Sequence, residues 1–140
     1  MTAQPTPAVG WAAPLAVVLG GMLGTGLRLA IELAFPHQQD GFPWAILAVN
    51  VAGSLLLGAL VSTLWTRPGT PPWLKAGLGA GVLGAFTTFS AVMASLVAMA
   101  ASGQWMLAVG YLAASLALGL TAAAGGLAIG RPNPVIGVDE

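Results

Sequence analysis

The stretch GVLGAFTTFS, residues Gly81–Ser90, decides the fold of this chain. It lies in an apolar run long enough to cross a bilayer, yet its glycines and adjacent β-branched threonines weaken a helix. Non-helical backbone at membrane depth persists only where protein buries it or where it lines a cavity. Transporters and channels place ion sites at such interruptions. The stretch therefore predicts a small membrane conduit with a broken third helix.

The composition indicates a chain that has the bilayer as its solvent. Of its 140 residues, 57% are hydrophobic and 6% are charged, whereas soluble domains carry about 25% charged residues. A net charge of zero gives no sign of a nucleic-acid partner. The chain has no cysteine, and its single histidine, His37, lies in a polar loop. We therefore expect neither a thiolate metal site nor an enzyme.

Four apolar runs have the length of about 20 residues that a membrane helix needs. We expect spans at residues 13–35, 43–65, 73–101 and 105–129. Together they form a transmembrane domain over 13–130, between a disordered lead at 1–12 and a tail at 131–140. The five tryptophans fall at span ends, where amphipathic indoles settle: Trp11, Trp44, Trp65, Trp73 and Trp105. The prediction is an all-α, multi-pass membrane protein.

Glycines at a spacing of four residues favour close packing between spans. They form two pairs, Gly20 with Gly24 and Gly77 with Gly81. Because four helices make a thin bundle that one copy would struggle to close around a polar path, we also expect a dimer.

The basic residues near the span ends favour both termini in the cytoplasm. Arg67 and Lys75 flank the second connector and Arg131 follows the fourth span, all on the side of the N-terminus. Arg28 is the only basic residue toward the opposite side.

Polar residues in the first two spans each have two interpretations. Arg28 and Glu32 lie four residues apart and could pair on one helix face. Either this pair is structural, or Arg28 attracts an anion into a vestibule. Asn50 either bonds a neighbouring helix or donates its amide to a dehydrated anion.

The third span carries the largest group of polar atoms. An interruption there would free backbone carbonyls, which suit hard cations. The hydroxyls of Thr87, Thr88 and Ser90, and the partly positive ring edge of Phe89, could face an anion. The alternative is that the hydroxyls bond their own helix and that Phe89 only packs.

Donors dominate the polar groups of the spans. Tyr111 and Ser115 share one face of the fourth span and either bond a neighbouring helix or join a polar path. Glu32 is the only carboxylate in the spans, whereas a cation path normally shows negative side chains. The pattern favours a small anion that is stripped of water.

Three motifs give the chain a resemblance to the bacterial fluoride channels called Fluc or CrcB. The motifs are GGMLGTGLR at 20–28, NVAGS at 50–54 and GAFTTFS at 84–90, of which the third is the most specific. The resemblance implies an antiparallel dimer of four-helix subunits, with dual topology and two pores at the interface. It also implies a cell-membrane channel that lets fluoride leave the cytoplasm passively and so reduces fluoride toxicity.

The resemblance further implies a role for individual residues. Backbone carbonyls of Gly84 and Thr87 would hold a structural sodium ion that is not transported. Arg28 matches the arginine of the first motif and is the vestibule candidate. The implied fluoride path contains Asn50, Thr88, Phe89, Ser90, Tyr111 and Ser115.

One position departs from the family pattern. The family usually has a second phenylalanine three residues after the first, and Val92 stands there in this chain. A homodimer would then lack one type of ring in both pores. A homodimer and a heterodimer with a paralogue both stay open, including one in which this chain is the non-conducting partner.

Two other classes compete with a fluoride channel. A small multidrug exporter that trades protons for cationic drugs needs a carboxylate within the membrane, and Glu32 beside Arg28 is the only candidate. The other class is a structural membrane subunit that transports nothing.

Overall fold

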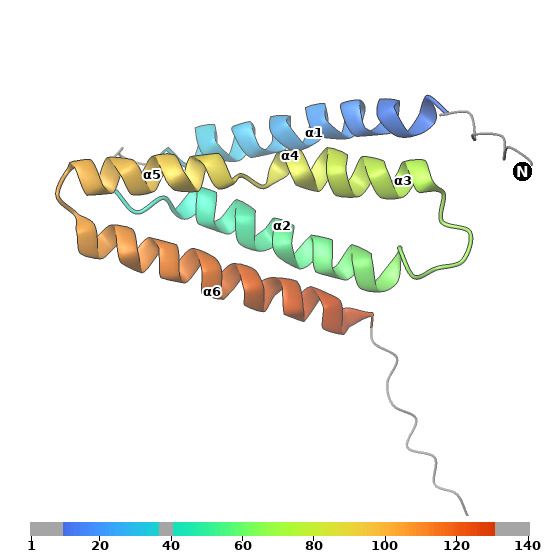
Figure 1. Cartoon of the computed structure of the whole chain (residues 1–140). Coiled ribbons are helices and arrows are strands. Elements are labelled where there is room, and N and C mark those ends of the chain that lie inside the picture. The colour runs from blue at the N-terminus through green and yellow to red at the C-terminus, as the bar shows by residue number, and fades with distance from the viewer. Residues whose placement is uncertain (1–9, 37–40, 131–140) are drawn as a thin grey trace, which may run out of the picture.

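The computed structural model describes residues 10–36 and 41–130 of the chain (Figure 1). The polar loop around His37, the tail over 131–140 and most of the lead over 1–12 lie outside the described residues.

Four helical spans cross the length of the molecule, and each is long and apolar enough to cross a membrane. The first span is α1 (Ala12–Ala34), the second is α2 (Trp44–Thr63) and the fourth is α6 (Trp105–Ile129). The third span covers Pro72–Ala101. The described residues contain no strand. The prediction of an all-α, multi-pass membrane protein with four spans is confirmed.

The third span is built from four successive elements, which are α3 (Pro72–Ala76), η1 (Gly77–Leu83), α4 (Gly84–Phe86) and α5 (Phe89–Ala101). η1 is a π-helix, a rare form that often lies at functional sites, and it was not predicted from the sequence. Between α4 and α5, Thr87 has φ −77° and ψ 151°, and Thr88 has φ −146° and ψ 119°. Both residues therefore have extended backbone at this point of the span.

Consecutive spans run in opposite directions (Figure 1). The start of α1, the connection from α2 to α3 and the end of α6 lie at one end of the bundle, and the turn from α5 to α6 lies at the other. Trp44 begins α2 and Trp105 begins α6. The tryptophans therefore mark span ends, as predicted.

Glycines bring the first and third spans into close contact. Gly20 and Gly24 are the buried residues of α1. A Cβ on Gly24 would overlap the carbonyl oxygen of Val82, and a Cβ on Gly81 would lie 2.9 Å from the carbonyl oxygen of Val17. The predicted packing role of these glycines is confirmed.

A second glycine contact, which was not predicted from the sequence, joins α2 to α6. A Cβ on Gly58 would overlap the carbonyl oxygen of Ala123, and one on Gly126 would overlap that of Leu55. These contacts hold α6 against α2, the helix that also carries Asn50.

Candidate functional site

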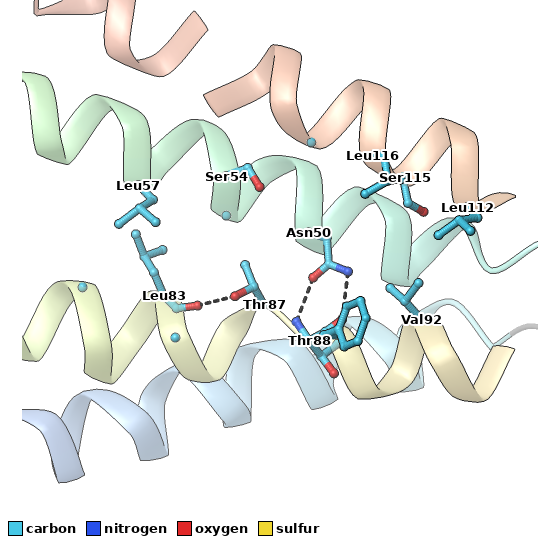
Figure 2. A pocket seen from close by; sticks show the side chains of 15 residues that line it. Asn50, Ser54, Leu57, Leu83, Thr87, Thr88, Val92, Leu112, Ser115 and Leu116 are labelled. Atoms are coloured by element: carbon cyan, nitrogen blue, oxygen red, sulfur yellow. Dashed lines mark hydrogen bonds between the residues drawn. The ribbon is translucent and has the colours of Figure 1, made fainter. Parts of the chain in front are cut away.

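A cleft of about 340 Å³ lies between α2, the third span and α6 (Figure 2). Its lining comes from three segments that are far apart in the sequence. From α2 come Asn50, Gly53, Ser54 and Leu57, and from α6 come Leu112, Ser115, Leu116 and Gly119. The third span contributes Gly79, Leu83, Gly84, Thr87, Thr88, Phe89 and Val92.

Helical spacing explains why α2 and α6 present these residues to one cleft. The four lining residues of α2 follow the spacing i, i+3, i+4 and i+7, and those of α6 do the same. Residues at this spacing share one face of a helix. Gly53 and Ser54 were not predicted as lining residues, although their distances from Asn50 along α2 would have placed them beside it.

Asn50 is bonded to the backbone of the third span at Thr88. Its Oδ1 accepts from the N–H of Thr88 at 2.8 Å, and its Nδ2 donates to the carbonyl oxygen of Thr88 at 3.0 Å. The interhelical bond considered for Asn50 is therefore present. An amide carries two N–H donors, and one of them is bonded to Thr88. The other N–H remains as a donor at the cleft.

The threonine hydroxyls beside Asn50 serve the local backbone. Thr87 Oγ1 donates to the carbonyl oxygen of Leu83 at 2.8 Å, which is the bond to its own helix that was the alternative for this residue. Thr88 Oγ1 accepts from the N–H of Ala91 at 3.2 Å and so caps the start of α5. Thr88 Oγ1 also lies 3.1 Å from Ser90 Oγ.

These bonds leave two backbone carbonyls at the cleft without their usual partners. In a continuous helix, the N–H of Thr88 would donate to Gly84 and that of Ala91 to Thr87. The first donates to Asn50 instead, and the second donates to the hydroxyl of Thr88. Within residues 10–36 and 41–130, no other hydrogen bond reaches these two carbonyl oxygens.

Carbonyl oxygen is a ligand that hard cations accept. The described residues hold no group of three or more histidine, aspartate or glutamate side chains that could bind a metal. The oxygens of Gly84 and Thr87 suit a hard cation, so the donor set of this site fits the predicted ion.

Arg28 lies outside the cleft lining and is paired. Its Nη1 lies 3.3 Å from Glu32 Oε1, and its Nε donates to the carbonyl oxygen of Ala85 at 3.3 Å. The side chains of Arg28 and Glu32 are 26% and 30% exposed. The predicted pairing is confirmed, and Arg28 also ties α1 to the end of α4.

Phe89 and Val92 lie one turn apart on α5 but in different surroundings. Phe89 is 73% exposed at the edge of the cleft, whereas Val92 is 5% exposed and packs in the core beside Met99 and Tyr111. Ser90 is exposed and does not line the cleft.

Tyr111 and Ser115 share a face of α6, but only Ser115 lines the cleft. Tyr111 is fully buried, with its ring edge-on to Phe42 at a centroid distance of 5.3 Å. Tyr111 Oη and Ser115 Oγ are both buried, and neither has a hydrogen-bond partner among the described residues. The cleft thus brings Asn50, Gly84, Thr87, Thr88, Phe89 and Ser115 together and leaves Arg28, Ser90 and Tyr111 outside.

Comparison with known proteins finds one family across most of the chain. Residues 15–127 match the family described as "CrcB-like protein, Camphor Resistance (CrcB)". The chain is similar to fluoride-specific ion channel FluC of Azotobacter vinelandii, with 46% identity over 114 residues, 81% of this chain and 92% of the relative. It is 37% identical to fluoride-specific ion channel FluC 2 of Geobacillus kaustophilus over 125 residues, 89% of this chain and 97% of that relative.

Proposed function

The chain belongs to the CrcB-like family, and from this membership we propose that it is a channel subunit through which fluoride crosses the membrane passively. Its relatives of 37% and 46% identity are named fluoride-specific ion channels. In a cell membrane, such a channel lets fluoride leave the cytoplasm and limits its toxicity.

The observation that carries this proposal is the chemistry of the cleft lining. Its side chains supply an amide and hydroxyls but no carboxylate. Donors without negative charge favour a small anion over a cation. The free N–H of Asn50 can replace water around fluoride, and the exposed ring edge of Phe89 adds partial positive charge.

A structural sodium ion fits the two free carbonyls. The oxygens of Gly84 and Thr87 would bind it, and its positive charge would favour an anion in the same cleft. A hard cation is bound by several oxygen ligands, so two carbonyls from one chain are too few. A second subunit that contributes the same two carbonyls would bring the set closer to completion.

A dimer also explains how the cleft is shielded from lipid. In a single chain the cleft opens beside Phe89, which is 73% exposed, and non-helical backbone cannot face hydrocarbon. A second subunit, antiparallel to the first, would cover it. Because Val92 replaces a ring of the family pattern and lies in the core, the second subunit is either a second copy or a paralogue that supplies the missing ring.

The proposal is tested by reconstituting the purified chain in liposomes loaded with fluoride and following efflux with a fluoride electrode. We expect rapid fluoride efflux and negligible chloride efflux. Chain that moves no fluoride, alone or with a coexpressed paralogue, would contradict the proposal. An uptake assay with a cationic dye addresses the exporter class, which the pairing of Glu32 with Arg28 disfavours.

A further inference from the structure

Several hydroxyl groups in and beside the spans already donate to the carbonyl three or four residues earlier, as serine and threonine commonly do. The donors are Ser62, Thr63, Thr66, Thr87 and Thr121, with distances from 2.6 to 3.2 Å to the carbonyl three or four residues earlier. Ser54 differs from them. Figure 2 shows its side chain at the cleft with no hydrogen bond to the other residues drawn, and none is found among the described residues.

The surroundings of Ser54 keep this hydroxyl open to the cleft. The residue lies one turn beyond Asn50 on the same face of α2 and lines the cleft with it. Opposite it on α6 is Gly119, and a Cβ built there would lie 3.9 Å from Ser54 Oγ. Because Gly119 has no side chain, nothing from this part of α6 covers the hydroxyl.

We propose that Ser54 is a second anion-binding donor of the cleft, which takes a small dehydrated anion from Asn50 and hydrogen-bonds it one turn further along α2. This inference rests on the proposed function. Residues four apart on a helix have Cβ atoms about 5–6 Å apart, a distance over which an anion can approach the next donor before it leaves the last. The passage would therefore follow α2 toward Leu57.

The test is fluoride efflux from liposomes at several fluoride concentrations. Ser54→Ala should lower efflux at subsaturating fluoride by about tenfold, the size expected for one hydrogen bond to an ion. The half-saturating concentration should rise, and the melting temperature in detergent should not change. Thr63→Val is the matched control, because that hydroxyl donates to the carbonyl oxygen of Ala59 at 2.6 Å, and its efflux should equal that of wild type.

Two rescue variants separate the hydroxyl from the shape of the site. Ser54→Thr keeps a donor and should retain most of the efflux. Ser54→Ala combined with Gly119→Ser puts a hydroxyl on the opposite helix, close to the original oxygen, and should recover part of it.

Equal efflux from wild type and Ser54→Ala would overturn this inference and leave the fluoride channel intact. Fluoride efflux through Ser54→Thr that is as slow as through Ser54→Ala would also overturn the inference about Ser54 and leave the fluoride channel intact. Wild-type chain that moves no fluoride would overturn both proposals.

Discussion

Asn50 on α2 binds both backbone groups of Thr88 in the third span. Oδ1 accepts from the Thr88 N–H at 2.8 Å, and Nδ2 donates to the Thr88 carbonyl oxygen at 3.0 Å. One side chain thus satisfies both polar groups of a residue with extended backbone, which would otherwise be unpaired within an apolar span. The same bonds withdraw the Thr88 N–H from Gly84, so they account for a free carbonyl at the cleft.

Asn50→Leu should therefore be strongly destabilising. It leaves the N–H and the carbonyl of Thr88 unpaired, and each buried unpaired group costs about 1–3 kcal/mol. We expect a lower melting temperature in detergent and loss of fluoride efflux. Thr66→Val, which removes an exposed hydroxyl from the turn after α2, is the control and should melt close to wild type. Unchanged melting of Asn50→Leu would contradict the structural role of this amide.

Arg28→Gln tests the contact between α1 and α4. The variant loses the guanidinium group, which donates to the Ala85 carbonyl oxygen and pairs with Glu32. A partly exposed ion pair contributes about 0–1 kcal/mol, so Glu32→Gln should change the melting temperature little. Arg28→Gln should lower it more, because Ala85 also loses its donor. If Arg28→Gln and Glu32→Gln lower the melting temperature by the same amount, at both low and high salt, the Arg28–Ala85 bond has no separate role.

Gly24→Ala tests the packing of α1 on η1. The new methyl would overlap the carbonyl oxygen of Val82, so the two helices would have to separate and the protein should lose stability. Gly26→Ala on the same helix has nothing within 4 Å of the new Cβ. It should be neutral or stabilising by up to about 1 kcal/mol, because alanine favours a helix more than glycine does. Melting temperatures of the two variants in detergent distinguish these outcomes.

Gly53→Ala tests the wall of the cleft itself. A Cβ on Gly53 would overlap the Cγ2 atom of Thr87, so it should displace Thr87 and its neighbouring carbonyl. We expect fluoride efflux to fall in protein that remains folded. Gly110→Ala on α6 meets nothing within 4 Å and should conduct as wild type. Normal efflux from Gly53→Ala would show that the position of Thr87 does not matter for transport.

Removal of sodium tests the proposed cation site. If carbonyls of Gly84 and Thr87 hold sodium, chain that is purified and assayed with a large organic cation in place of sodium should lose efflux. It should regain efflux when sodium is returned. Full activity after exhaustive exchange would exclude a required sodium ion.

Much of the architecture could be predicted from local sequence. Span number and approximate limits follow from runs of apolar residues, because bilayer thickness sets the length of a helix that crosses it. Close packing of Gly20 and Gly24 against another helix followed from their spacing of four residues, because glycines at this spacing let helix backbones approach closely. That the third span is their partner did not follow from the spacing. The π-helix η1 and the contact of Gly58 with α6 could not be predicted in this way, because both depend on how neighbouring helices dock.

The sequence by itself determined an all-helical membrane chain with four spans. It also determined that several hydrogen-bond donors lie near one glycine-rich segment. Only the tertiary structure decided which of those donors are occupied. Asn50 meets a partner 38 residues away and Arg28 one 57 residues away, and the packing of α6 buries Tyr111 while leaving Ser115 at the cleft. The physical reason is that the length of its own apolar run decides whether a helix spans the bilayer. A hydrogen bond between helices at membrane depth instead requires a partner that another helix brings into place.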